Sequence, residues 1–97
     1  MRRVIHEAAL RAFREALDHY HAVSPELGVS FYREMERLIL NVCEHPHLFR
    51  VFDPPARRHF SARFPYGIVY LPTSDYIWIV AMIHLHRVPG YWRERVE

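Results

Sequence analysis

The feature that most constrains this chain is a change of hydrophobic period near its middle. From Ala9 to Val42, apolar residues recur every three or four positions, which is the spacing of helices that each bury one side. After Pro54-Pro55 the spacing falls to two, the alternation of a half-buried β-strand. A helical half followed by a strand half predicts an α+β domain, with helices packed on one face of an antiparallel sheet.

Local signals divide the helical half into two helices. Ser24, Pro25 and Glu26 are typical of an N-cap, a proline at the first helical position and an acid near the positive helix end. The first helix therefore ends near Val23, and Pro46 stops the second. Because the connection is very short, the two helices should form an antiparallel hairpin.

The second half predicts a meander of three consecutive strands joined by short, proline-containing links. The expected strands cover residues 57–64, 66–71 and 76–85. Val4 and Ile5 can add a short strand before the first helix. The full prediction is a short N-terminal strand and a helix hairpin packed on a three- to four-stranded antiparallel sheet.

Alternation also predicts which side chains face the helices. The expected core set is Ile77, Ile79, Ala81, Ile83 and Leu85 of the last strand with Phe60, Ala62 and Phe64 of the first meander strand. The opposite face of the sheet is expected to carry two other sets of side chains. From the last strand these are Trp78, Val80, Met82, His84 and His86, and from the first meander strand they are His59, Ser61 and Arg63. We therefore expect an open sheet face that carries imidazole and guanidinium groups.

Length and composition place limits on the class of protein. Ninety-seven residues, half of them hydrophobic and a quarter charged, fit one globular domain over residues 1–97. No apolar run approaches a membrane span, and Met1-Arg2-Arg3 does not open a secretory signal, so we expect a cytoplasmic protein without a membrane partner. The single cysteine, Cys43, excludes an internal disulfide, and without a Cys pair or acid at ligand spacing we expect no metal or other cofactor.

Positive charge is concentrated in the second half. Residues 1–48 hold six Arg and seven acids, whereas residues 49–97 hold seven Arg and four acids, and there is no Lys in the chain. The planar guanidinium fork binds phosphate and carboxylate at two points. The bias therefore suits an acidic or nucleic-acid partner, with a solvated protein surface as the alternative interpretation.

Several short sequence segments, taken in their order along the chain, resemble the RelE/ParE toxin superfamily, and the resemblance covers nearly the whole chain. They are Phe13-Arg14-Glu15-Ala16, Tyr20, Glu44-His45-Pro46, Arg57-Arg58, Arg63-Phe64-Pro65-Tyr66-Gly67-Ile68-Val69-Tyr70 and His84-Leu85-His86-Arg87-Val88-Pro89-Gly90-Tyr91-Trp92. The resemblance implies the toxin of a type II toxin-antitoxin system, of the kind that stabilises plasmids, neutralised by a cognate antitoxin protein. It also implies a homodimer or a toxin-antitoxin hetero-oligomer as the possible assemblies.

The superfamily divides by target, and the resemblance leaves both branches open. One branch cuts mRNA on the ribosome as an mRNA interferase, and the other inhibits growth by binding DNA gyrase. Where the ribonuclease branch places lysines, this chain has His59 and Ser61, and Gly67 replaces an expected arginine. Because Arg87 and Tyr91 alone keep their counterparts, we favour the gyrase inhibitor, with an inert antitoxin-binding module as a third alternative.

Candidate site residues follow from these alternatives. For a ribonuclease, His84 and His86 would serve as acid and base, Arg87 would clamp phosphate, and Tyr91 would stack on a base or donate a proton. The candidates for binding a target or a phosphate are Arg57, Arg58, His59, Arg63 and Arg93. The simpler interpretation makes the histidines surface residues and makes Tyr91-Trp92 an aromatic lid on the core.

Overall fold

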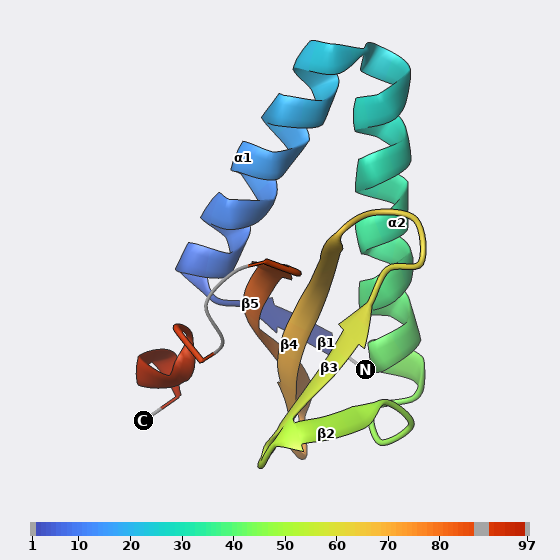
Figure 1. Cartoon of the computed structure of the whole chain (residues 1–97). Helices are drawn as coiled ribbons and strands as arrows, with labels where there is room; N and C mark the ends of the chain where they lie inside the picture. Colours follow the sequence, from blue (N-terminus) through green and yellow to red (C-terminus); the bar gives the residue numbers. More distant parts are fainter. Residues whose placement is uncertain (1, 87–89, 97) are drawn as a thin grey trace.

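The computed structural model of the chain describes residues 2–86 and 90–96, and it places two helices against one face of a five-stranded sheet (Figure 1). The elements are β1 (Arg2–Ile5), α1 (Glu7–Val23), α2 (Pro25–Glu44), β2 (Arg50–Asp53), β3 (Ala56–Phe60), β4 (Tyr66–Pro72), β5 (Tyr76–His84) and a 3-10 turn, η1 (Arg93–Arg95). The predicted α+β class is therefore confirmed. Neither helix of the described residues has the length and hydrophobicity of a transmembrane span.

The helix hairpin has the predicted boundaries because its signals are local. The Ser24 hydroxyl oxygen accepts the Leu27 backbone N–H at 3.0 Å, and Pro25 is the first residue of α2. Near the tip, Gly28 lets the two helices approach closely, since an added Cβ would lie 2.9 Å from the His21 Cα. Capping and this close contact fix the antiparallel hairpin seen in Figure 1.

The sheet is mixed and has more strands than the sequence predicts. Its order is β1-β5-β4-β3-β2, and β1 pairs parallel to β5 while the other pairs are antiparallel. The prediction of a purely antiparallel sheet of three to four strands is therefore wrong in two respects. The sequence underestimates the number of strands because β2 is too short for an alternating pattern to be visible in its sequence. It misses the parallel direction of β1 because β1 pairs with β5, which lies beyond both helices and the meander along the chain.

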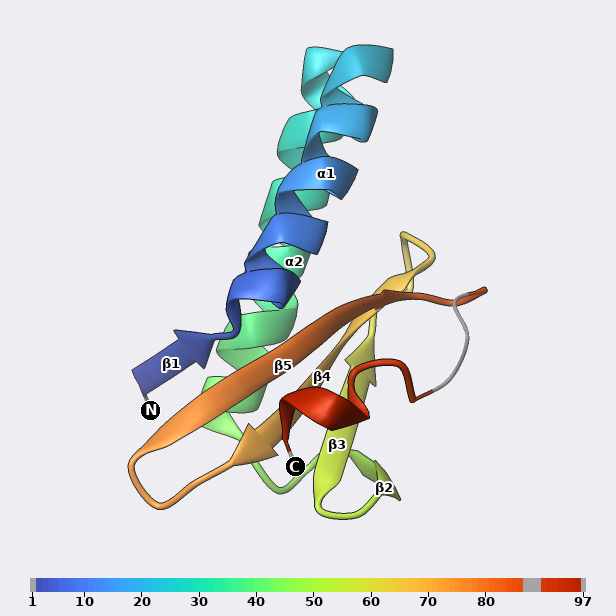
Figure 2. The same cartoon turned by 90° about the vertical axis from the view of Figure 1, so that its left-hand side faces the viewer.

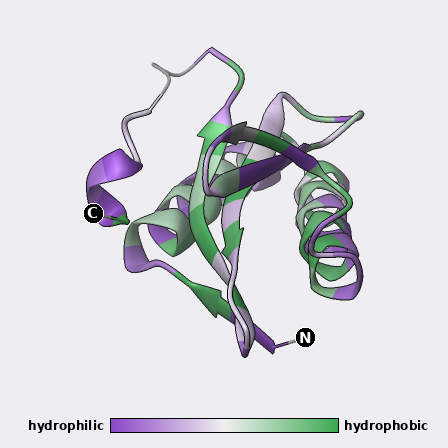
Figure 3. Ribbon diagram, turned by 90° about the horizontal axis from the view of Figure 1, so that it is seen from below, coloured by the Kyte–Doolittle hydropathy of each residue, from purple (hydrophilic) through white to green (hydrophobic). Residues whose placement is uncertain are grey.

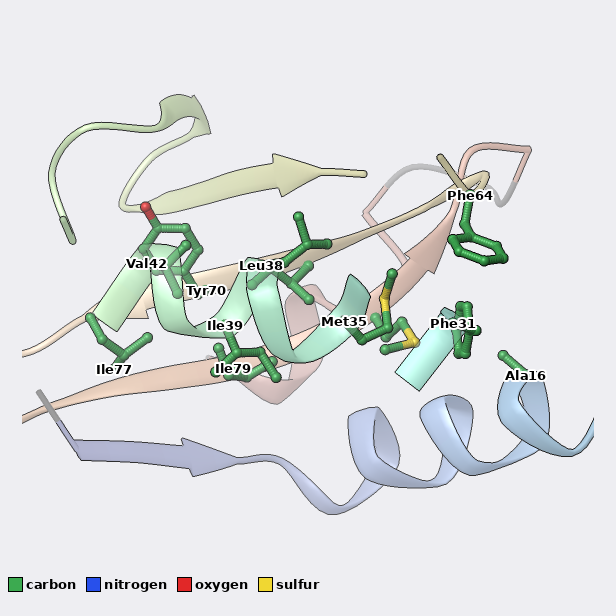
Figure 4. Packing of buried hydrophobic residues seen from close by; sticks show 12 residues of the cluster. Ala16, Phe31, Met35, Leu38, Ile39, Val42, Phe64, Tyr70, Ile77 and Ile79 are labelled. Atoms are coloured by element: carbon green, nitrogen blue, oxygen red, sulfur yellow. The ribbon is translucent and has the colours of Figure 1, made fainter. Parts of the chain in front are cut away.

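The main core lies between the helix hairpin and the sheet (Figure 4). Phe31, Leu38 and Val42 lie on one stripe of α2 and are 0% exposed. Tyr70 is buried with them, its hydroxyl donating to the Pro46 carbonyl at 3.0 Å, and burial raises the pKa of Tyr70 to about 12. Each such side chain contributes about 1.5–3 kcal/mol through burial, so this cluster is the main stabilising contact between the layers.

The second face of the sheet is also covered, by the C-terminal segment that crosses it in Figure 2. Trp92 is 2% exposed there, the Tyr91 hydroxyl donates to the Met82 carbonyl at 3.1 Å, and Arg95 Nη1 donates to the Val80 carbonyl at 2.9 Å. The predicted aromatic lid is confirmed, and the predicted open polar face is wrong. The central strands are largely hydrophobic and the η1 turn is hydrophilic (Figure 3), because the strands are buried on both faces.

A β-bulge at Val80 changes the alternation of β5. Val69 pairs with Ala81 and Tyr70 pairs with Ile79, so Val80 is an extra residue on its strand. Val80 and Ala81 consequently both lie in the second-face cluster. Residues beyond the bulge face the side opposite to the one that strict alternation predicts.

The bulge corrects the predicted faces of the last strand. Ala81 and Ile83, which were predicted to face the helices, pack in the second-face cluster. Met82, predicted to face away, belongs to the helix-side core, and His84 lies opposite Tyr66 on that same side. Leu85 is 54% exposed and lies in a turn, so its predicted core position is wrong too.

The first meander strand also ends earlier than predicted. Strand β3 stops at Phe60, and residues 61–65 form the connection to β4. Phe60 packs over Gly67 on the second face and Ala62 is exposed, so only Phe64 of the predicted trio reaches the helix-side core. Alternation does not continue through the bend, and His59 points to α2 instead.

Candidate functional site

Two predicted site residues, His84 and Tyr91, meet in a cleft between α1 and the end of β5. The cleft has a volume of about 240 Å³. Its lining consists of Ala12, Glu15, Ala16, His19, Tyr66, Met82, His84 and Tyr91, and we call it the His84 cleft. The bulge at Val80 produces it, because without the extra residue His84 would lie on the second face.

The rings in the His84 cleft have defined contacts. The His84 ring is perpendicular to the Tyr66 ring, with centroids 5.0 Å apart, and its centroid lies 5.2 Å from that of His86. His84 Nδ1 accepts the His86 backbone N–H at 3.1 Å. The neutral His84 ring therefore carries its proton on Nε2, which leaves Nε2–H as a donor.

The His84 cleft combines two tyrosine rings, Tyr66 and Tyr91, with two imidazoles, His19 and His84. An imidazole offers both a hydrogen-bond donor and an acceptor, and aromatic rings stack on planar groups such as nucleobases. Tyr91 lines the cleft, and its hydroxyl donates to the Met82 carbonyl. Within residues 2–86 and 90–96, no three His, Cys, Asp or Glu side chains come together to hold a metal ion. Arg87, the predicted phosphate clamp, lies outside the described residues.

A second polar cluster joins α2 to β3 and the residue after it, and we call it the α2–β3 seam. It consists of Glu34, Arg37, Asn41, His59 and Ser61. Glu34 is 3% exposed and receives two N–H groups of Arg37, at 2.7 and 3.0 Å, as well as the Ser61 hydroxyl. The Arg37 hydrogen bonds hold the pKa of Glu34 below its ordinary value despite burial. The polar side chains of the seam therefore find their hydrogen-bond partners within the seam.

His59 is an internal member of that seam. Its ring stacks on Phe49 with centroids 3.8 Å apart, and its Nε2 lies 3.2 Å from Asn41 Oδ1. Burial lowers the pKa of His59, and the Arg37 charge lowers it further. Arg57 is likewise engaged, since its Nη1 donates to the His47 and Phe49 carbonyls. Both side chains hold the fold together on the helix side of β3.

The remaining predicted arginines lie in separate places. Arg58 is on the other side of β3, 5.2 Å from the Phe60 ring centroid. Arg63 is exposed in the connection between β3 and β4, and Arg93 forms an ion pair with Asp53 at 2.5 Å. The prediction that one open sheet face carries Arg63 together with His59 is therefore wrong. Helices cover one face and the C-terminal segment covers the other.

The structure adds residues that alternation did not indicate. Glu15 and His19 reach the His84 cleft from α1, where a spacing of four places them on one helix face. Glu34 and Arg37 form an i,i+3 pair on α2. Both spacings are readable in the sequence, but the strand residue that each pair meets depends on tertiary packing.

Comparisons with known proteins give no assignment. No protein-family model matches the chain, and no curated protein shows significant similarity to it. The interpretation of the two clusters therefore depends on their geometry and on the resemblance described above.

Proposed function

We propose that the chain is the toxin of a type II toxin-antitoxin pair, a growth inhibitor that a cognate antitoxin neutralises. Two kinds of observation support this proposal. The phrases that resemble the RelE/ParE superfamily extend from Phe13 to Trp92. The order of a strand, a helix hairpin and a strand meander agrees with the order that the resemblance implies. The antitoxin is the partner that follows from the proposal.

We further propose that the toxin acts by binding DNA gyrase, without cutting nucleic acid. The observation that carries this choice concerns three positions where the ribonuclease branch places cationic side chains. His59 and Ser61 are engaged in the α2–β3 seam. At Gly67 the Phe60 ring occupies the space that a side chain would need, since an added Cβ would lie 2.1 Å from the Phe60 Cδ1 atom. None of the three can present a cation to a phosphate.

A ribosome-dependent ribonuclease is the second candidate, and the His84 cleft favours it. Cleavage of RNA needs a base for the ribose 2′-OH, an acid for the leaving oxygen and charge stabilisation at phosphorus. His84 and Tyr91 line the same cleft, and the His86 ring lies beside that of His84. This arrangement supplies imidazole and phenol groups and a stacking surface, while Arg57 of β3 and Arg93 of η1 are engaged elsewhere.

Growth experiments test the toxin proposal. Expression of the chain alone should arrest growth, and co-expression of the neighbouring gene, expected to encode a short acidic antitoxin, should relieve the arrest. Harmless expression without that gene would contradict a toxin and favour the inert antitoxin-binding module.

Purified components separate the two targets. The gyrase proposal predicts that the chain inhibits supercoiling and leaves ribosome-bound mRNA intact. The double variant His84→Ala, His86→Ala should retain gyrase inhibition, whereas a ribonuclease would lose roughly a hundredfold to ten-thousandfold in rate. The matched control is His45→Ala, His47→Ala, which removes two exposed histidines at the end of α2. If the chain cleaves mRNA, and if His84→Ala, His86→Ala abolishes that cleavage while the control variant does not, gyrase binding is refuted as the mechanism.

A further inference from the structure

A second hollow lies between the two helices and the sheet, and Met82 lines both this hollow and the His84 cleft. The helices diverge from their shared tip toward the sheet, α1 over β5 and α2 along β4 (Figure 1). The wedge between them encloses about 360 Å³, which is within the size range of small-molecule sites. We call it the hairpin groove.

The lining of the hairpin groove is almost entirely apolar. Side chains that represent its three walls are Ala9, Leu10 and Phe13 of α1, Met35 and Ile39 of α2, and Ile79 of β5. Hydrocarbon surfaces of this kind hold water poorly, because a buried water needs two to four polar partners. The groove is therefore suited to a hydrocarbon chain.

The charges at the rim indicate which end group the occupant carries. Two charged residues line the groove, Arg14 from α1 and Glu36 from α2. Both Glu36 carboxylate oxygens accept from Arg3 Nη1, at 2.8 and 3.0 Å, so that carboxylate is neutralised. Arg14 is exposed and forms no ion pair within the described part of the chain. The rim thus has one uncompensated positive charge.

We propose that the hairpin groove binds a single-chain amphiphile with an anionic head, such as a medium-chain fatty carboxylate. The hydrocarbon chain lies against the apolar walls and the head pairs with Arg14. The apolar lining and the charge of the rim together exclude a polar ligand and disfavour a cationic one. This binding is independent of the proposed toxin activity, so either proposal can fail without the other.

Calorimetric titration with octanoate, decanoate and dodecanoate, each below its micelle concentration, tests the site. We expect one ligand per chain and an affinity that rises about fourfold per methylene until the groove is full. Decyltrimethylammonium should bind more weakly than decanoate. Equal binding of the cation, no dependence on chain length, or many ligands per chain would overturn the proposal.

Variants locate the ligand. Arg14→Gln should weaken decanoate binding about two- to fivefold and leave decanol binding unchanged, because an exposed ion pair contributes little. Arg11→Gln is the matched control, since Arg11 is exposed on α1 and does not line the groove. Ala9→Leu, which grows into the groove, should abolish binding of both ligands. If Ala9→Leu fails to fold, Leu10→Trp replaces it, because Leu10 is a half-buried lining residue whose enlargement should also abolish binding of both ligands.

Two further outcomes would assign the groove to a macromolecule. A concentration-dependent dimer that decanoate does not dissociate, and that Ala9→Leu disrupts, would make the groove an interface between two copies of the chain. Tight binding of an amphipathic helical peptide, with no binding of decanoate, would make it a helix-binding groove. Either result would overturn the amphiphile proposal.

Discussion

Replacing Gly67 by alanine gives the most direct test of how the second sheet face is packed. An added Cβ would lie 2.1, 2.6 and 2.8 Å from the Cδ1, Cε1 and Cγ atoms of Phe60. Carbon atoms pack at about 3.5–4.0 Å, so the ring has to move by roughly 1.4 Å or more. Phe60 is half-buried and the Arg58 guanidinium lies 5.2 Å from its ring centroid, which limits that movement.

The expected cost follows from two opposing effects. Overpacking of this kind costs about 1–3 kcal/mol, and replacing glycine within a strand returns about 0.5–1 kcal/mol. We expect Gly67→Ala to lower the free energy of unfolding by about 1–2 kcal/mol in a urea titration. The corresponding fall in melting temperature is roughly 5–15 °C for a domain of this length.

A double-mutant cycle with Phe60→Ala isolates the contact. Without the ring, Gly67→Ala should be neutral or should stabilise the protein by up to about 1 kcal/mol. The reasoning is refuted if Gly67→Ala costs the same in both backgrounds, or if it costs nothing while Phe60 is present.

Three other outcomes are expected. Ser61→Ala removes one donated and two accepted hydrogen bonds, so it should lower the free energy of unfolding by about 1–3 kcal/mol in a urea titration. The control Ser74→Ala, in an exposed turn, should be near neutral. Equal effects of the two variants would contradict a structural role of the α2–β3 seam. Burial keeps the pKa of His59 below its ordinary value of 6.5, so the folded chain binds fewer protons than the unfolded one and stability should fall as pH is lowered through 6.5. His59→Gln should flatten that dependence in melting curves, and an unchanged slope would show that His59 is not its source. Trp92→Ala should cost about 3–5 kcal/mol and expose a sheet face that binds a hydrophobic dye, whereas a cooperative fold of unchanged stability would show that the C-terminal segment is not part of the core.

Sequence patterns agree best with the structure where that structure depends on neighbours along the chain. The Ser24 cap and the Pro25 start predict the helix boundary, and the structure has it at that place. Sequence patterns agree least with the structure at the candidate site. Alternation put His59 and His84 on one open face, whereas His59 points to α2 and His84 to α1.

The amino-acid sequence by itself determined the α+β class, the two helices and four of the five strands, including the short one at Val4 and Ile5, because capping, proline placement and hydrophobic period act over a few residues. Only the tertiary structure decided the parallel pairing of β1, the bulge at Val80 and the cover over the second face. An extra residue in a ladder reverses every side chain beyond it, and no local pattern records where it is inserted. The composition of each cluster was therefore set by contacts between residues far apart in the chain.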